Sequence, residues 1–168
     1  NKATGAPGHE VLSTTGGEVK LKSSRYPFCA TGDLKSDNSV RSAMTLVPFN
    51  EELNRFTLVL KNGRAAKYKV TWGTESHSYT AAHLGKGVNL ADDFATNPFS
   101  AAFGKVEAAV AAKQSYETHQ IKNMFHGPEF RAEPETIIAL TEKFRTPLAN
   151  AIKTAFVPVT HTIKVVAE

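Results

Sequence analysis

The stretch that decides the fold reads Arg55-Phe-Thr-Leu-Val-Leu-Lys-Asn-Gly-Arg-Ala-Ala-Lys-Tyr-Lys-Val-Thr-Trp72. Apolar and polar residues alternate on both sides of Asn62-Gly63, and such alternation is typical of strands with one buried face. Asn-Gly between two runs of this kind is the strongest short-range indication of a β-hairpin. We therefore predict a central hairpin over residues 55–72. Its apolar face needs a cover, because two strands alone are marginal in water.

Further strands are predicted on either side of this hairpin. His9 to Thr14 and Glu18 to Ser23 flank the turn at Gly16-Gly17. A terminal strand is expected over residues 159–166, with His161 on its inward face as a hydrogen-bonded core residue. The remaining expected strands are Val40 to Val47, which Pro48 limits, and Ser76 to Thr80.

Two long helices are predicted between the strands. Asn97-Pro98 is a favourable start, and apolar residues recur behind it at helical spacing to about residue 126. Glu133-Pro134 opens a second helix to about residue 156. We expect an α+β fold in which an antiparallel β layer packs against two antiparallel helices. The prediction is one α+β accessory domain over 1–168, β-rich over 9–80 and 159–166 and helical over 97–156.

Composition excludes several classes of protein. The 168 residues are 41% hydrophobic and 21% charged, with a net charge of +4. No apolar run is long enough to cross a membrane, and the basic residues are scattered among acids, so we predict neither a membrane span nor nucleic-acid binding. The single cysteine, Cys29, cannot form an internal disulfide or a cysteine-based metal cage. We expect Cys29 to be a small buried apolar residue.

No local motif for catalysis or cofactor binding is present. The chain lacks Gly-x-Ser-x-Gly, His-Glu-x-x-His, a phosphate-binding Gly-x-x-x-x-Gly-Lys loop and Gly-x-Gly-x-x-Gly. His119 and His126 stand seven residues apart, on one face of the expected helix, but no third metal ligand can be placed. We therefore predict no metal site, no cofactor and no catalytic residue.

The loop from Arg25 to Arg41 is the candidate binding surface. It combines flat apolar side chains with the fixed donors of arginine, a mixture favoured in pockets and interfaces. The alternative is structural: two aromatic residues plug the end of the β layer, and the arginines pair with Asp33 or Asp37. The candidate binding residues are Arg25, Tyr26, Phe28 and Arg41.

Several ordered blocks across nearly the whole chain resemble the C-terminal part of bacterial SGNH (GDSL-type) hydrolases. Those enzymes cleave acyl or acetyl esters, some of them on carbohydrates. The blocks are Ser24-Arg-Tyr-Pro-Phe-Cys29, Leu46-Val-Pro-Phe-Asn-Glu-Glu-Leu-Asn-Arg-Phe-Thr-Leu58, Lys69-Val-Thr-Trp-Gly73, Gly87-Val-Asn-Leu-Ala91, Asn97-Pro-Phe-Ser100 and Val157-Pro-Val-Thr-His-Thr-Ile-Lys164.

The resemblance implies a region without the catalytic machinery. The family carries its nucleophile in a Gly-Asp-Ser block and its acid and base in an Asp-x-x-His block, and both blocks are missing here. At Gly32-Asp33-Leu34, Leu34 stands where the serine would be. The expectation is an inactive fragment or processed chain of a secreted bacterial enzyme, extracellular or periplasmic. Its partner would be the missing N-terminal catalytic domain.

Two other functions stay open. One is a free-standing carbohydrate- or ligand-binding module, with Trp72, Tyr26 or Tyr79 as stacking platforms for a sugar. The other is a subunit that docks onto another polypeptide through the exposed loop. The resemblance favours Trp72 as an anchor of the core rather than a site residue.

Overall fold

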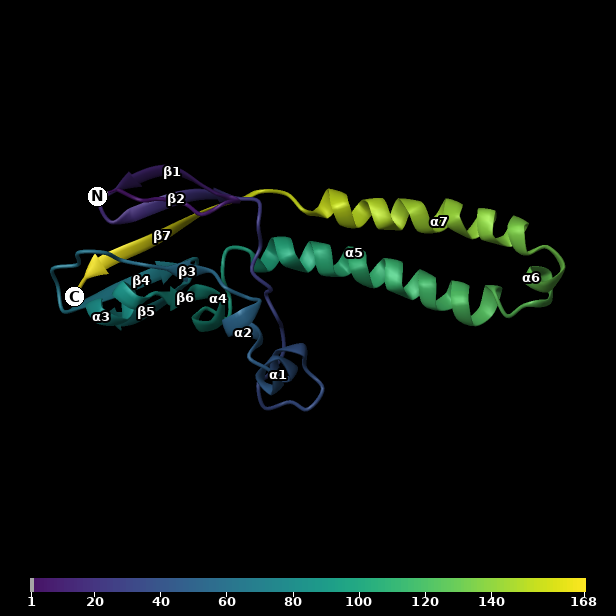
Figure 1. Ribbon diagram of the computed structural model, residues 1–168, viewed down its shortest axis with the longest axis horizontal. Helices are drawn as coiled ribbons and strands as arrows, with labels where there is room; N and C mark the ends of the chain where they lie inside the picture. The colour runs from purple at the N-terminus through teal and green to yellow at the C-terminus, as the bar shows by residue number, and fades with distance from the viewer. Residues whose placement is uncertain (1) are drawn as a thin grey trace. The chain divides into compact units, whose positions relative to one another are not determined.

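The computed structural model describes residues 2–168, and the chain forms two compact units. One comprises the chain up to Ser100 together with Pro158–Glu168, and the other is Ala101–Val157. The first holds a five-stranded antiparallel sheet and the second two long helices, so the predicted α+β class is confirmed (Figure 1). Whether residues 1–168 act as a single domain stays a prediction.

The sheet is antiparallel throughout, in the order β1-β2-β7-β4-β5. The predicted strands at both ends of the chain are present, and the C-terminal strand lies in the middle of the sheet, between β2 and β4 (Figure 1). A sheet of five strands can be stable in water, whereas a hairpin of two strands alone is marginal. The strands are β1 (His9–Thr15), β2 (Glu18–Ser23), β4 (Lys67–Trp72), β5 (Glu75–Thr80) and β7 (Val159–Ala167).

The predicted central hairpin over 55–72 is wrong in its pairing. β4 pairs with β5 across a turn at Gly73, whose φ is +68°, and with β7 on its other edge. The chain does turn at Asn62, where φ is +57°. The arm before that turn forms β3 (Thr57–Leu58), which pairs with β6 (Val88–Asn89) in a separate two-stranded sheet. A strand has two edges, and both edges of β4 are occupied.

The expected strand over Val40 to Val47 is also wrong. This segment forms the helix α1 (Val40–Ala43) and a 3₁₀ turn, Met44–Leu46, followed by the helix α2 (Phe49–Glu52). The Ser39 hydroxyl accepts a hydrogen bond of 3.0 Å from the backbone N–H of Ser42, as an N-cap does. The cap satisfies a backbone donor locally, which a strand would have to satisfy by pairing.

Trp72 lies at the centre of the core of the first unit and is fully buried. Phe56 stacks on its indole ring at 4.8 Å between ring centroids, and Phe94 and Phe99 pack on it edge-on at 5.8 Å each. The expectation that Trp72 is a core anchor is confirmed. The rings that cover it come from residues before and after the sheet strands, within the same unit.

Two short helices complete the first unit. The helix α3 (Ala81–Lys86) is capped by the Thr80 hydroxyl, which accepts from the backbone N–H of His83 at 3.1 Å. The helix α4 (Leu90–Asp93) follows β6 and is capped by Asn89. Each contributes one fully buried leucine to the core: Leu84 and Leu90.

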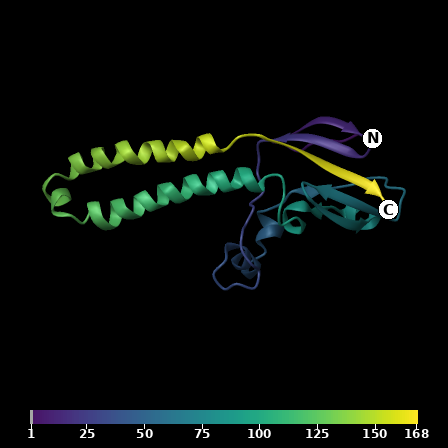
Figure 2. The ribbon, with the colours of Figure 1, turned by 180° about the vertical axis from the view of Figure 1, so that it is seen from behind.

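The second unit is a helical hairpin. The helix α5 (Ser100–His119) continues into a π-helical turn, Gln120–Met124, and the chain returns through α6 (Pro128–Ala132) and α7 (Pro134–Ala155). Both views show α5 and α7 side by side and antiparallel, as predicted (Figures 1 and 2). Gln120 donates to the Thr141 hydroxyl at 2.8 Å, and Tyr116 donates to the Thr141 carbonyl at 3.1 Å.

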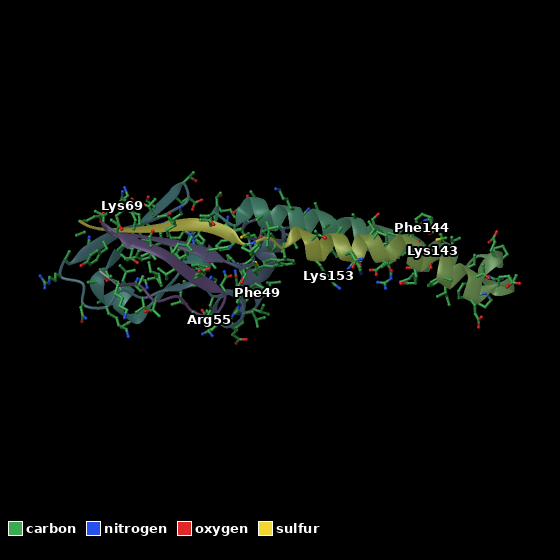
Figure 3. All side chains as sticks on the ribbon, turned by 90° about the horizontal axis from the view of Figure 1, so that it is seen from above. Phe49, Arg55, Lys69, Lys143, Phe144 and Lys153 are labelled. Atoms are coloured by element: carbon green, nitrogen blue, oxygen red, sulfur yellow. The ribbon has the colours of Figure 1, made fainter. Side chains whose placement is uncertain are left out.

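Two helices alone bury few of their apolar side chains. Within Ala101–Val157 only Val106, Gln120 and Thr141 are buried, whereas Phe144, labelled on α7 in Figure 3, is 60% exposed. None of the helices among residues 2–168 is both long enough and apolar enough to span a bilayer.

Candidate functional site

An open pocket of about 500 Å³ lies within the first unit. Its walls come from the segment that contains α1 and α2, from α4 and from the residues that follow α4. This volume is in the range of small-molecule sites. The residues that line it are Phe28, Cys29, Ala30, Leu34, Arg41, Met44, Thr45, Leu46, Val47, Pro48, Phe49, Asn50, Glu51, Ala91, Asp92, Phe94, Ala95 and Asn97.

A buried asparagine fixes one wall of the pocket. The Asn54 side chain accepts from the backbone N–H of Phe28 at 2.8 Å and donates to the Phe28 carbonyl at 3.1 Å. It thereby pairs with the Phe28 backbone as a neighbouring strand would. The Phe28 ring then packs edge-on against Phe49, with 5.5 Å between ring centroids. Asn54 thus holds an aromatic wall in place.

Further amide hydrogen bonds hold the pocket-lining residues Asn50 and Asp92 together. Asn50 donates to Oδ1 of Asp92 at 2.7 Å, and Asn89 donates to the backbone carbonyls of Asn50 and Asn54 at 2.9 Å each. These bonds join the α2 segment to α4. Asn50 and Asn89 are partly buried, and because an amide that is shielded from water loses free energy when it is left unpaired, these bonds help to hold the two segments together.

Arg41 is half-buried and extends the pocket lining from α1. Among residues 2–168, no carboxylate lies within ion-pair distance of its guanidinium, and its side chain makes no hydrogen bond to a protein group. The carboxylates of Glu51 and Asp92 also line the pocket, and both residues are exposed. Arg41 is therefore a cation whose donors are available to a ligand.

The structure brings together two of the four predicted binding residues. Phe28 and Arg41 line the pocket. Arg25 is exposed and lies against Gly8, and Tyr26 packs edge-on against Phe99 at 5.3 Å, so neither lines the pocket. The alternative pairing of Arg25 or Arg41 with Asp33 or Asp37 is absent from the described part of the chain.

Cys29 lines the pocket, but its thiol has hydrogen-bond acceptors within the protein. It is buried, as predicted, and its Sγ lies 3.6 Å from Oδ1 of Asn97 and 3.5 Å from the Pro27 carbonyl oxygen, so its single S–H can donate to either of them. Burial raises the pKa of the Cys29 thiol, against a smaller lowering by the bonds to Asn97 and Ser100. A neutral thiol is a weak nucleophile, so the geometry gives Cys29 a packing role.

The sequence reasoning missed a buried chain of side-chain hydrogen bonds in the sheet. The Trp72 indole donates to Nδ1 of His161 at 3.0 Å, and Nε2 of His161 and Nδ1 of His9 each lie 2.9 Å from the Ser23 hydroxyl. An indole nitrogen only donates, so Nδ1 of His161 accepts and its Nε2–H donates to Ser23. The Ser23 hydroxyl then donates to His9. The expectation that His161 is a hydrogen-bonded core residue is confirmed.

This Ser23–His9–His161 group has the residue types of a hydrolase but not the access. Ser23 is fully buried, and a nucleophilic oxygen must reach the acyl carbon of a substrate. Burial, and to a lesser extent His9, lowers the pKa of His161 to about 4, which keeps its ring neutral. The paired strands β2 and β7 would have to separate to open it. The only sequence signal for this group is that Ser23 and His161 both occupy inward-facing positions of their strands.

Two of the three proposed stacking platforms for a sugar, Trp72 and Tyr79, are buried, whereas Tyr26 is partly exposed. Trp72 is fully buried, and Tyr79 is 8% exposed with its hydroxyl donated to Oδ2 of Asp93 at 2.7 Å. Burial and the neighbouring Asp93 raise the pKa of Tyr79. No group of three His, Cys, Asp or Glu side chains that could hold a metal occurs within residues 2–168.

No protein-family model matches the chain. No curated protein matches it either. In structure the chain is similar to a gut microbial diltiazem-metabolizing enzyme, BT4096, with a TM-score of 0.61 and 16% sequence identity. The match covers 99% of this chain and 47% of that enzyme's chain, so the chain spans about half the length of the structure it matches. At this identity the likeness shows a shared fold.

Proposed function

We propose that the chain is a non-catalytic accessory region of a secreted bacterial ester hydrolase of the SGNH/GDSL type, which acts on acyl or carbohydrate acetyl esters. One observation carries the proposal: 99% of the chain has the fold of less than half of a longer chain that is described as an enzyme. The sequence blocks that resemble SGNH hydrolases supply the type of enzyme. The catalytic domain of the same protein would be the partner.

The chemistry of the described residues supports the non-catalytic part of the proposal. The serine closest to histidine, Ser23, is sealed between paired strands, and the thiol of Cys29 is buried and neutral. Both would need access and activation to attack an ester. The accessory role is then to shape substrate access or to pack against the catalytic domain.

The exposed apolar side chains around the pocket support such a contact. Leu46, Val47 and Leu34 line the pocket and are 82%, 58% and 53% exposed, and Leu53, directly after α2, is 75% exposed. Contiguous exposed apolar side chains are typical of interaction surfaces. We therefore place the contact with the catalytic domain or its substrate on the segment from Phe28 to Leu53.

The test is an assay of the purified chain with 4-nitrophenyl acetate, together with labelling by a fluorophosphonate probe. We expect neither turnover above the Ser23→Ala variant nor labelling. Turnover that the fluorophosphonate abolishes would overturn the proposal. The encoded sequence upstream is a second test, because the proposal requires Gly-Asp-Ser and Asp-x-x-His blocks there.

A second candidate function is a free-standing ligand-binding module, and the pocket beside Arg41 favours it. It differs from the first proposal in needing no catalytic domain. Titration calorimetry against a panel of oligosaccharides separates the two, since a region that only packs against a catalytic domain releases no heat with a free sugar. A role as a docking subunit would appear as a stable complex in native mass spectrometry.

A further inference from the structure

We propose that the pocket binds a small organic carboxylate with an apolar tail, and that the Arg41 guanidinium pairs with the carboxylate group. The binding site stands on the geometry of the pocket. Its meaning for the cell rests on the proposed function: hydrolysis of an ester adds water across the acyl–oxygen bond and releases an alcohol and a carboxylate. The acid product is a ligand of this class.

Arg41 offers the pocket a guanidinium with unused donors. A guanidinium carries five donors in a planar fork that matches the two oxygens of a carboxylate. Arg41 is half-buried, and within the described part of the chain its side chain has no acceptor from the protein. Since ion pairs strengthen as water is excluded, a carboxylate that enters the pocket gains more from Arg41 than from an exposed arginine such as Arg25.

Apolar side chains line much of the pocket. Met44, Leu46 and Val47 line one part of the pocket, and the Phe28–Phe49 pair lines another. Burying one methylene of a ligand against such a surface raises affinity about four-fold. A carboxylate with a chain of several carbons therefore fits better than acetate, which offers a single methyl group, or than phosphate and sulfate, which offer no apolar surface.

Two acidic residues that line the pocket, Glu51 and Asp92, oppose the binding of an anion. Glu51 and Asp92 are exposed, and one oxygen of Asp92 already accepts from Asn50. Charges in contact with bulk water are strongly screened, whereas the half-buried Arg41 is screened less. Arg41 consequently determines the sign of the ligand charge. An amine with the same chain length as the carboxylate tests this, because it carries the opposite charge.

The chain offers an internal reporter for the experiment, because it has two methionines, Met44 and Met124. Met44 lines the pocket, whereas Met124 belongs to the π-helical turn of the other unit. Carbon-13 labelling of the methionine methyl groups gives two signals in an NMR titration. Octanoate below its micelle concentration should shift the Met44 signal in a saturable way and leave the Met124 signal unchanged.

Matched ligands and variants complete the test. Butanoate, hexanoate and octanoate should bind with rising affinity, and octanamide, the uncharged isostere, at least ten-fold more weakly than octanoate. Arg41→Gln should lose at least ten-fold for octanoate and nothing for octanamide. Arg41→Lys should be intermediate, because lysine keeps the charge and loses the fork. Arg25→Gln makes the same change of charge outside the pocket and should bind as the native chain does.

Three results would overturn the inference: equal affinity for octanoate and octanamide, tighter binding of octylamine, or an Arg41→Gln variant that binds as Arg25→Gln does. Absence of any shift at millimolar octanoate in a chain whose circular dichroism is native would overturn it as well. None of these results touches the ester assay. Ester turnover by the isolated chain, in turn, would remove the proposed function and leave carboxylate binding in place.

Discussion

The indole nitrogen of Trp72 donates a 3.0 Å hydrogen bond to Nδ1 of His161, which joins the side chains of two neighbouring strands at the centre of the sheet. Trp72 is fully buried and His161 is 5% exposed, so water reaches neither group well. Through His161 the bond continues to Ser23 and His9. The stability of the first unit therefore depends on a polar chain inside its core.

Replacing Trp72 by phenylalanine tests this bond. The variant removes the donor and leaves Nδ1 of His161 buried without a partner, which should lower the free energy of unfolding by about 1–3 kcal/mol. Trp72→Ala should cost about 3–5 kcal/mol, because it also opens a cavity. Urea unfolding followed by circular dichroism measures both. The control is Lys69→Ala, on the exposed face of the same strand (Figure 3), which should change stability little. A Trp72→Phe variant as stable as the native chain would contradict the prediction.

The same chain predicts how stability depends on pH. Burial lowers the pKa of His161 from its ordinary 6.5 to about 4, and the pKa of His9 is also lowered, by burial and by Arg25. Between pH 4 and pH 6.5 His161 binds a proton in the unfolded chain but not in the folded one, so the free energy of unfolding rises with pH. The stabilisation is complete above about pH 6.5 and is lost as the pH falls toward 4, with an upper limit on the order of 3 kcal/mol for His161.

Urea midpoints measured between pH 4 and pH 8 check this dependence. His161→Gln should be less stable than the native chain at pH 8 and should show a flatter profile. His83→Gln, at an exposed position in α3, should keep the native slope. A native chain whose midpoint is constant from pH 7 to pH 4.5 would show that protonation of these histidines is not linked to unfolding.

The turn between β1 and β2 offers a matched pair of glycine substitutions. Gly16 and Gly17 both have positive φ, +59° and +83°. A Cβ at Gly16 would meet nothing within 4 Å, but at Gly17 it would come 2.5 Å from the Val165 carbonyl oxygen. Gly16→Ala should cost about 1 kcal/mol for its backbone conformation. Gly17→Ala should cost roughly 2 kcal/mol or more, because it also disturbs the 2.8 Å bond from the Val165 N–H to the Gly17 carbonyl.

Thermal unfolding of the two alanine variants and of the native chain ranks their costs. Gly16→Ala serves as the control for the change of glycine to alanine in a turn. Equal midpoints for the two variants would mean that the close approach to Val165 is relieved by movement of the turn.

In the helical hairpin, substitutions of Gln120 and Thr141 should have non-additive effects on the free energy of unfolding, because their side chains are hydrogen-bonded. Thr141→Val removes the Thr141 hydroxyl as an acceptor for the buried amide of Gln120, which also bonds the Glu142 side chain, and should destabilise the hairpin by about 1–3 kcal/mol. Gln120→Leu alone should cost less, since the Thr141 hydroxyl still donates to the Ile138 carbonyl at 3.0 Å. The double variant should be more stable than the sum of the single variants predicts.

Hydrogen exchange of the amides in α5 and α7 measures this cycle without requiring the whole chain to unfold. Lys143→Gln, an exposed change on α7 labelled in Figure 3, is the control and should leave exchange unaltered. Strict additivity of the two single variants would show that Gln120 and Thr141 do not depend on each other.

The sequence predicted the elements better than their partners. The helix start at Asn97-Pro98 was correct within two residues, because the signals for it are local: the Asn97 side chain accepts from the Phe99 N–H at 3.0 Å. Alternation correctly placed Trp72 and His161 on inward faces. Alternation does not specify which strand lies beside which, so the expected pairing across Asn62-Gly63 was wrong.

The candidate site was found in part for the same reason. Aromatic and arginine content marked the loop from Arg25 to Arg41, and Phe28 and Arg41 do line the pocket. Nothing in the local sequence separated them from Arg25 and Tyr26. That separation depends on Asn54, which pairs with the Phe28 backbone across 26 residues of sequence.

By itself, then, the sequence determined the α+β class, the two long helices, the terminal strands and the inward face of β7, since helix caps and residue periodicity act over a few neighbouring residues. Only the tertiary structure decided that β7 enters between β2 and β4, that Ser23 joins His9 and His161, and that Arg41 faces an open pocket. Those features arise from contacts between residues far apart in the chain, whose pairing is selected by burial and by the satisfaction of buried polar groups.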